Sequence, residues 1–386
     1  FVFAAGNGRL GVDNCNFDGY ANSPFSFTIG AISAADKTPY YMEECANMLA
    51  VTYSSGRPGF DPKITTTDLN AGCTDKHGGT SAAAPLAAGI LALALSVRPD
   101  LTWRDWQSLV IASVQPLAQD DKTWIENGAG LRYSSLFGFG KIDAHALVTK
   151  AREWKTLNPP LLRSFPWIRT HQTIPARKGA LVQSLLTLEY PLHWDYFELA
   201  ELKRIEHVTV SVNIRHGRRG DLIFRLCSPS HTCFPLTSRR PLDNDSKEGL
   251  TGWTFGTVAF WGETAVLGTW TLQIFNAAVS DEEARSGQFI SWRLGVWGER
   301  EEAAGFDADA YSSAFVNNYF PPSVDYFNDV DGVFRKRPSQ IINHAYRDRP
   351  TTTSTTTQGK QLKTGWIFLV GVILSLISLA LMYIIK

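Results

Sequence analysis

The sequence lacks an excess of charge of either sign, because 37 Lys and Arg residues balance 37 Asp and Glu residues. A strongly basic chain would favour nucleic-acid binding, and a strongly acidic chain would favour a solvating tail. Neither class fits, and we expect no nucleic-acid partner. The chain of 386 residues, 44% of them hydrophobic, is large enough for two ordinary domains with their own cores.

The sequence also lacks an initiator methionine. It opens at Phe1 on the apolar string Phe-Val-Phe-Ala-Ala, which is too short and has the wrong flanks for a signal peptide. Such a string is typical of a buried strand. We therefore expect an N-terminally truncated part of a longer protein, with a sheet edge and apolar surface left uncovered.

Cysteines are few and odd in number: Cys15, Cys45, Cys73, Cys227 and Cys233. In a chain bound for an oxidising compartment, an odd count suggests that one partner is missing. Cys227 and Cys233 are close enough in sequence to close a small loop. The alternative is that these residues are buried free thiols.

Charge is absent from Trp366 to Ile385, a run bracketed by Lys363 and Lys386. A helix of about 20 apolar residues spans a bilayer core of about 30 Å. A buried soluble helix is the alternative, although helices this long and apolar are uncommon in cores. We expect a single transmembrane helix over residues 365–385.

Residues 1–155 mix short apolar strands with helical patterns. The pattern predicts helices over 81–97, 103–113 and 144–154, and Pro85 falls in the first turns of the first helix, where a proline costs least. Strands that alternate with helices are typical of an α/β layer architecture.

The pattern changes in the second half of the chain. Apolar residues occupy every second position over 208–214, 270–274 and 290–296, which predicts an antiparallel β-sandwich or barrel over 167–299. Residues 156–166 contain three prolines and are predicted to be a linker.

Residues 300–364 lose this periodicity and end in a threonine-rich tract over 351–357. Such a segment cannot bury apolar surface, so we expect a disordered luminal linker and stalk, of a kind that is often O-glycosylated. Asn244 is a candidate acceptor for N-glycosylation, because it begins an Asn-Asp-Ser string.

The string His77-Gly-Gly-Thr-Ser81-Ala-Ala-Ala-Pro85 carries the clearest chemical signal. A serine hydroxyl becomes a nucleophile only when it is exposed, positioned and deprotonated during attack. The glycines permit a tight turn and a close approach of substrate to the backbone. Ser81 then opens a helix, whose free N–H groups can stabilise a developing oxyanion. The alternative is that Ser81 only caps the helix.

The whole string resembles the active-site signature of subtilisin-like serine proteases of the kexin/furin type. Further matching strings in the first half are Ala4–Gly8, Asp13–Tyr20, Tyr40–Cys45, Leu101–Trp106 and Gly138–Ala144. The predicted β-sandwich resembles the jelly-roll-like P (Homo B) domain of this family in Arg219–Leu222, Gly252–Phe255, Phe260–Glu263 and Trp292–Glu299. The resemblance covers about residues 1–299, and the stalk and membrane helix fit the layout of kexin.

The resemblance implies a role for each of several residues. Ser81 is the nucleophile, Asn7 donates to the oxyanion, and Asp18 lines the pocket for a basic side chain. Asp13 and Glu43 are calcium ligands, in keeping with the preference of Ca²⁺ for oxygen. The alternatives are a turn residue for Asn7 and solvated surface acids for the three carboxylates.

The resemblance also pairs Cys15 with Cys45, and Cys73 with a cysteine upstream of this sequence. It implies a calcium-dependent serine endoprotease that cleaves secretory proproteins after paired basic residues. The longer protein would be a type I single-pass protein of the late Golgi membrane, with its catalytic side in the lumen. The competing hypothesis is a catalytically inert, membrane-tethered remnant that acts as a binding module.

The catalytic Asp and His of the family lie upstream of this sequence, and none of its eight histidines has a suitable position. We therefore expect residues 1–386 alone to be inactive. The strings Arg218-Arg219 and Arg239-Arg240 are interpreted as charged loops rather than processing sites. Likewise, Arg219-Gly-Asp221 is interpreted as a turn rather than an integrin-binding motif.

Overall fold

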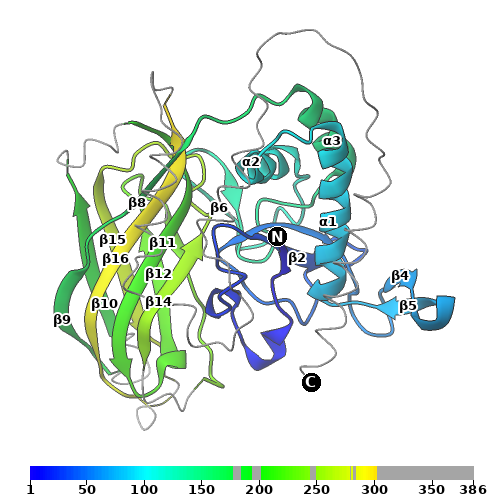
Figure 1. Ribbon diagram of the computed structural model, residues 1–386. Coiled ribbons are helices and arrows are strands. Elements are labelled where there is room, and N and C mark those ends of the chain that lie inside the picture. Colours follow the sequence, from blue (N-terminus) through cyan, green and yellow to red (C-terminus); the bar gives the residue numbers. More distant parts are fainter. Residues whose placement is uncertain (177–183, 194–200, 244–248, 279, 281–283, 302–386) are drawn as a thin grey trace, which may run out of the picture. The chain divides into compact units, whose positions relative to one another are not determined.

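The computed structural model describes residues 1–176, 184–193, 201–243, 249–278, 280 and 284–301. Three sequence-based predictions lie outside the described residues: the stalk beyond its first two residues, the transmembrane helix over 365–385, and Asn244. The described residues form a mixed helix-and-strand part (residues 1–154, here called the first lobe) and a β-sandwich that begins at Pro160 (Figure 1). Both belong to one compact unit.

The strands and helices of the first lobe are, in chain order, β1 (Val2–Ala4), β2 (Phe27–Ile32), β3 (Met48–Tyr53), β4 (Ile64–Thr67), β5 (Cys73–His77), α1 (Thr80–Val97), α2 (Trp103–Ser113), β6 (Ile125–Glu126), β7 (Arg132–Tyr133) and α3 (Ala144–Glu153). Short 3-10 helices lie at η1 (Gly8–Gly11), η2 (Cys15–Phe17) and η3 (Leu69–Ala71).

The strands of the β-sandwich are β8 (Pro160–Ser164), β9 (Ile168–Ile174), β10 (Ser184–Leu192), β11 (Leu202–His216), β12 (Leu222–Cys227), β13 (Cys233–Pro235), β14 (Leu250–Thr257), β15 (Gly268–Asn276) and β16 (Gly287–Arg300). One 3-10 helix, η5 (Arg219–Asp221), precedes β12.

A parallel sheet with strand order β1-β2-β3 forms the centre of the first lobe. All six residues of β2 are buried, as is typical of a parallel strand covered on both faces. Helix α1 packs against all three strands, and α2 packs against β3 (Figure 1). The layered arrangement confirms the predicted α/β architecture of this part of the chain.

Local sequence signals explain where the helices begin. Thr102 and Asp105 form a reciprocal capping box at α2, and the side chain of Asp143 caps α3. Helix α1 begins directly after Gly79. Because these signals are local, the helices predicted from sequence match the observed bounds within one residue.

Helix α1 is, among the described residues, the helix that is long and apolar enough to span a membrane. In the structure it packs on the parallel sheet and on α3, and it leaves Leu86, Leu93 and Leu95 exposed. Strand β1 has one neighbour, β2, and therefore lies at the sheet edge.

The β-sandwich consists of two sheets with orders β10-β15-β12-β13 and β14-β11-β16-β8, and β9 also pairs with β16. Every second residue of β10 is buried, which is the alternation expected for a strand with one face in the core. Phe224 of β12 and Phe255 of β14 meet across the sheets with ring centroids 4.8 Å apart. The predicted antiparallel β-sandwich is confirmed.

The predicted linker over 156–166 is wrong in part, because β8 occupies Pro160–Ser164. This strand pairs with β16 at the end of its sheet. A proline is tolerated at the first residue of an edge strand, where its missing N–H removes no ladder hydrogen bond. Prolines are therefore compatible both with a linker and with the start of an edge strand, and here Pro160 starts such a strand.

The first lobe and the β-sandwich meet along a contact region that we call the seam. Arg104 of α2 forms a bidentate ion pair with Glu206 of β11, with distances of 2.8 Å from Nε and 2.6 Å from Nη2. The Asn16 amide of the first lobe donates to the backbone carbonyl oxygens of Leu236 and Gly256 in the sandwich. The seam is thus built from buried, specific hydrogen bonds.

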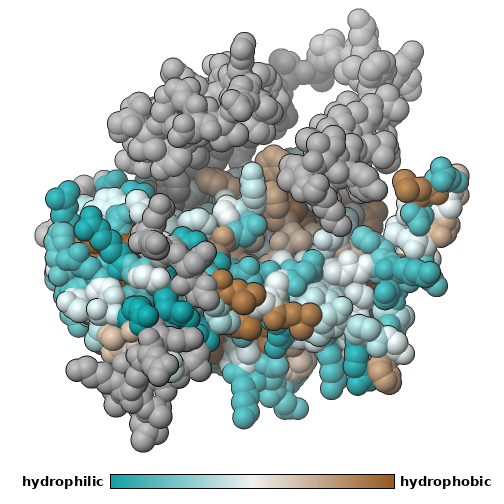
Figure 2. All heavy atoms as spheres, turned by 90° about the horizontal axis from the view of Figure 1, so that it is seen from below, coloured by the Kyte–Doolittle hydropathy of each residue, from teal (hydrophilic) through white to brown (hydrophobic). Residues whose placement is uncertain are grey.

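The two parts are also adjacent at the edge of the seam, where Leu242 of the sandwich lies beside Gly11. A Cβ atom on Gly11 would lie 3.2 Å from Cδ1 of Leu242 in the sandwich, so these two segments are adjacent. Leu10, Val12 and Leu242 are exposed. Figure 2 shows hydrophobic residues gathered in a few separate patches on an otherwise mostly hydrophilic face. Scattered exposure of this kind is ordinary for a folded protein.

Candidate active site

Ser81 is the second residue of α1, and it is exposed. Gly78 and Gly79 lead into the helix, and Gly79 has a φ of +79°, a conformation that favours glycine. A Cβ atom on Gly78 would collide with the side chain of Ser55. The Gly79 N–H donates to Ser55 Oγ at 3.2 Å, and this bond anchors the loop before the helix.

Asn7 lies against this helix start. Its Oδ1 accepts hydrogen bonds from the Thr80 N–H at 2.8 Å and from the Thr80 hydroxyl at 3.0 Å. The side chain of Asn7 makes no capping bond to its own 3-10 turn, so it does not act as a local turn residue. Because Thr80 occupies the amide oxygen, the Asn7 NH₂ group is left as a donor close to Gly79, just before the start of α1.

The segment of Asn7 and the start of α1 together supply candidate hydrogen-bond donors for an oxyanion hole. The N–H groups in the first turn of a helix have no intrahelical acceptor, and Ser81 lies in that turn. The Thr80 N–H already donates to Asn7 Oδ1 and the Ala82 N–H to the Gly79 carbonyl oxygen. The Ser81 N–H and the Asn7 amide are therefore the candidate donors for an oxygen that becomes negative during attack on a carbonyl. The sequence assigned no role to Thr80, although it lies within the glycine-rich string, and gave no signal for Ser55, which contacts that string from a distant segment.

No histidine among the described residues hydrogen-bonds to Ser81. His77 ends β5, four positions before Ser81. His207 is buried in the seam, where its Nε2 pairs with Gln107 at 2.8 Å. Burial, and to a smaller extent the charge of the nearby Arg104, lower the pKa of His207 to about 3. Among the described residues, therefore, no histidine is hydrogen-bonded to the candidate nucleophile Ser81.

Asp18 follows η2 and is exposed. Its Oδ1 accepts hydrogen bonds from the N–H groups of Tyr20 and Ala21, at 2.8 and 2.9 Å. These bonds fix the carboxylate at the turn and leave Oδ2 open. Such a fixed and open carboxylate oxygen can accept a charge-assisted hydrogen bond from a basic side chain.

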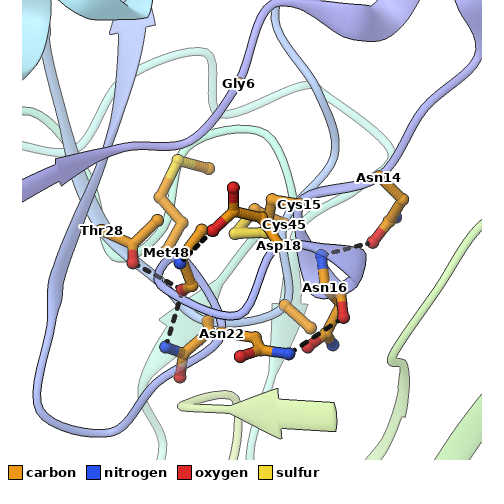
Figure 3. Close-up of a disulfide and its surroundings, with 12 residues drawn as sticks. Gly6, Asn14, Cys15, Asn16, Asp18, Asn22, Thr28, Cys45 and Met48 are labelled. Atoms are coloured by element: carbon orange, nitrogen blue, oxygen red, sulfur yellow. Dashed lines mark hydrogen bonds between the residues drawn. A yellow bond between two sulfur atoms is a disulfide. The ribbon is translucent and has the colours of Figure 1, made fainter. Parts of the chain in front are cut away.

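The disulfide Cys15–Cys45 joins the segment of Asp18 to the segment of Glu43 (Figure 3). The second disulfide expected from the sequence, Cys227–Cys233, links β12 to β13. Cys73 is exposed and has no disulfide partner among the described residues. An upstream partner for Cys73 therefore stays a prediction.

Asp13, Asp18 and Glu43 form an acidic cluster. The Gly8 N–H donates to Glu43 Oε1 at 2.7 Å. A Cβ atom on Gly8 would lie 2.8 Å from Asp13 Cβ and 2.8 Å from Glu43 Oε1, so the two candidate ligands approach the same point. Burial raises the pKa of Glu43, and the charges of Asp13 and Asp18 raise it further, against the hydrogen bond from Gly8.

A calcium ion needs more ligands than this cluster supplies. Ca²⁺ takes six to eight oxygens, whereas Asp13 and Glu43 offer two carboxylates. The described part of the chain holds no group of three or more His, Cys, Asp or Glu residues that could bind a metal. Arg240 of the sandwich reaches across the seam to Asp13, with Nε 2.7 Å from Oδ1. Asp13 and Glu43 thus fit part of a calcium coordination shell, and the Arg240 guanidinium places a positive charge beside Asp13.

Two family models match the chain. The subtilase family matches residues 1–140, and the proprotein convertase P-domain matches residues 205–296. The residues between the two matches, 141–204, include α3 of the first lobe and strands β8, β9 and β10 of the β-sandwich.

Curated relatives match over both parts. The dibasic-processing endoprotease of Schizosaccharomyces pombe is 40% identical over 92% of this chain and 48% of its own length. Kexin of Saccharomyces cerevisiae is 42% identical over 78% of this chain and 35% of its own length. Proprotein convertase subtilisin/kexin type 7 of Homo sapiens is 42% identical over 77% of this chain and 37% of its own length. The chain spans half or less of the length of these relatives.

A solved structure has a similar fold. The crystal structure of the serine protease of Aeromonas sobria superposes with a TM-score of 0.66 at 22% identity, covering 77% of this chain and 64% of that protein. At this identity the likeness concerns the fold alone.

Proposed function

The chain belongs to the kexin-type proprotein convertases of the subtilase family, and on that premise we propose that it is part of a serine endoprotease that cleaves secretory proproteins after paired basic residues. The arrangement of Asn7, Thr80 and Ser81 carries this proposal. It combines an exposed serine at a helix start with an amide donor whose orientation two hydrogen bonds fix. The substrate class is that of the relatives, a dibasic-processing endoprotease and a proprotein convertase.

In this proposal Ser81 Oγ attacks the scissile carbonyl, and the Asn7 amide and the Ser81 N–H receive the oxyanion. Asp18 accepts hydrogen bonds from the basic side chain before the scissile bond. A general base must come from residues other than the described ones, because none of their histidines bonds to Ser81. Relatives twice as long as this chain have room for that base.

We also propose that the complete protein depends on calcium. Asp13 and Glu43 would hold the ion together with further oxygen ligands, and its charge would neutralise the acidic cluster beside Gly8. The convergence of the two carboxylates and the raised pKa of Glu43 support this role. Attachment to the late Golgi membrane through the predicted helix over 365–385, with the catalytic side in the lumen, completes the proposal.

The test uses the full-length coding sequence that contains this chain. Ser81→Ala should abolish cleavage of a secreted reporter with a Lys-Arg site, because subtilisin-type enzymes lose about 10⁶ in kcat with their nucleophile. Ser96→Ala is the matched control, since Ser96 is an exposed serine of the same helix. Cleavage at the wild-type rate by Ser81→Ala would refute the role of Ser81.

A second candidate function rests on the observation that no histidine among the described residues is hydrogen-bonded to Ser81. If the full-length protein carries no base, the seam and the sandwich remain intact, and the molecule would act as a tethered binding module. That outcome predicts no reporter cleavage by the wild-type protein and no difference between wild type and Ser81→Ala. Cleavage that depends on Ser81 excludes it.

A further inference from the structure

Three pairs of adjacent basic residues occur in the described part of the chain, all in the β-sandwich: Lys203-Arg204, Arg218-Arg219 and Arg239-Arg240. Lys203-Arg204 and Arg218-Arg219 have the sequence that the proposed activity would cleave, whereas the bond after Arg240 leads to Pro241, which lacks the backbone N–H of an ordinary scissile bond. A protease with this specificity meets such pairs in every copy of itself that shares its compartment. The surroundings of these pairs therefore bear on whether the enzyme destroys itself.

All six basic side chains form ion pairs with three sandwich carboxylates among the described residues, and Arg240 also pairs with Asp13 of the first lobe. Asp221 pairs with Arg218 at 3.0 Å and with Arg239 at 2.8 Å. Asp243 pairs with Arg219 and Arg240, both at 2.8 Å. The third carboxylate is Glu299, which lies 3.3 Å from Lys203 and 2.8 Å from Arg204.

The three carboxylates are poorly accessible. The side chains of Asp221, Asp243 and Glu299 are 3%, 12% and 5% exposed. Each carboxylate bridges two basic residues, so that one buried negative charge holds two side chains. Asp221 binds Arg218 and Arg239, and Asp243 binds Arg219 and Arg240. These two carboxylates therefore connect the basic pair at 218–219 to the basic pair at 239–240 through ion pairs.

The backbone is also held in a form that a protease cannot bind. Arg219–Asp221 is a 3-10 helix rather than an extended strand. The Gly220 N–H, which belongs to the bond after Arg219, donates to the Asp243 carbonyl oxygen at 3.0 Å. The Arg240 N–H donates to the Gly220 carbonyl oxygen at 2.7 Å. A Cβ atom on Gly220 would collide with the backbone of Arg240, so the two segments are in direct contact.

A protease cleft takes a peptide in extended form, with backbone hydrogen bonds along it and side chains in alternate pockets. Neither condition is met at residues 218–220 while the ion pairs and the 3-10 helix persist. Cleavage there requires local opening, and its rate then follows the population of the opened form.

We propose that Asp221, Asp243 and Glu299 guard the paired basic residues of the sandwich against cleavage by proteases of dibasic specificity, the complete form of this protein included. The proposal gives the buried acids of the sandwich a protective role and makes Arg219–Gly220 a latent cleavage site. Hydrolysis there would break the bond between the Arg219 carbonyl carbon and the Gly220 nitrogen. The hydroxyl of water would go to that carbon and a proton to that nitrogen. The link to self-cleavage rests on the proposed function, whereas the guarding itself does not.

The test is limited proteolysis of the full chain with trypsin, which cuts after Arg and Lys without needing any activity of this protein. Fragments are identified by mass. Lys63 and Lys76, exposed residues beside or within the β4–β5 hairpin of the first lobe (Figure 1), serve as internal reference sites. We expect cleavage after Arg219 in the wild type to be at least about 100-fold slower than after these two lysines.

Asp221→Asn and, separately, Asp243→Asn should raise the rate of cleavage after Arg219 by about 10- to 100-fold, the factor expected when opening no longer breaks charge-assisted hydrogen bonds. Asp120→Asn, at an exposed loop acid of the first lobe, should change nothing. Val212→Ala removes a buried apolar side chain of β11 but no ion pair. It should raise cleavage across the sandwich without preference for Arg219.

Two results would overturn the proposal. One is wild-type cleavage after Arg219 as fast as after Lys63. The other is an Asp243→Asn pattern that matches that of Val212→Ala, which would mean that the acids act only through overall stability. The two Asn variants are independent, so if one fails to fold the other still decides.

A second arm replaces trypsin with the purified dibasic-processing endoprotease of S. pombe, a protein that matches this chain. The same preference for the Asn variants is expected. If guarding holds in both arms while the full-length protein never cleaves a Lys-Arg reporter, the proposed function fails and the guarding stands. If the reporter is cleaved but the Asn variants are no more sensitive, the guarding fails and the proposed function stands.

Discussion

Arg104→Met should destabilise the described unit strongly, because Arg104 holds a buried charge at the seam. Its partner Glu206 has a side chain that is 2% exposed, and Arg104 itself is 6% exposed. The guanidinium also donates to the Asn158 carbonyl oxygen at 2.9 Å. Loss of the guanidinium leaves a carboxylate without its counter-charge in a site that water does not reach.

The expected cost follows from that burial. Breaking a buried pair by removing one partner costs about 3–5 kcal/mol, because the remaining ion keeps its desolvation penalty. Replacing both partners with apolar residues of similar volume is often close to neutral. We therefore expect Arg104→Met to lose about 3–5 kcal/mol and the double change Arg104→Met with Glu206→Met to recover most of that loss.

The measurement is urea unfolding of the purified full chain, followed by fluorescence of its 12 tryptophans. Asp100→Asn is the control, since it removes the charge of an ion pair with Arg98 whose Asp100 side chain is 59% exposed. Exposed pairs contribute about 0–1 kcal/mol. A loss for Arg104→Met no greater than that for Asp100→Asn would refute the reasoning, as would a double variant less stable than the single one.

Three further predictions concern the candidate site. Asn7→Ala in the full-length protein should lower kcat by about 10²- to 10³-fold with little change in KM, since the amide acts on the oxyanion; an effect on KM alone would contradict this. Asp18→Asn should lower the ratio of kcat/KM for Arg over apolar peptides, and an unchanged ratio in a kinetic panel removes Asp18 from the pocket. The pKa of Glu43 is raised on folding, so its contribution favours the native state below about pH 4.5 and is lost as pH rises through the folded pKa. Glu43→Gln should therefore raise the melting temperature at pH 7 in EDTA but not at pH 4, and equal shifts at both would show that ionisation is not the cause.

A fourth prediction concerns the chain by itself. Residues 1–386 should not cleave a fluorogenic Lys-Arg peptide in the presence of calcium, because Ser81 has no base among the described residues. Turnover by the chain that disappears in Ser81→Ala would show that a base exists within it.

The sequence alone predicted those features that depend on neighbours in the chain. The helices α1, α2 and α3 begin at a glycine-rich turn, a Thr-Asp capping box and an Asp cap, all of which are visible within a few residues. The alternation along β11, β15 and β16 likewise revealed a sandwich, since side chains of a strand face opposite sides in turn. The same alternation could not identify β8, whose prolines are equally typical of a linker and of an edge strand.

The candidate residues were named from motifs, but their arrangement depends on contacts between distant segments. Asn7 meets Thr80 across 73 positions, and Arg240 meets Asp13 across 227. Nothing in the local sequence of Arg239-Arg240 indicates that buried carboxylates hold both side chains. Which charges neutralise one another is decided when the two sheets and the first lobe pack, because only packing brings such groups within hydrogen-bonding distance and removes the water that would otherwise separate them.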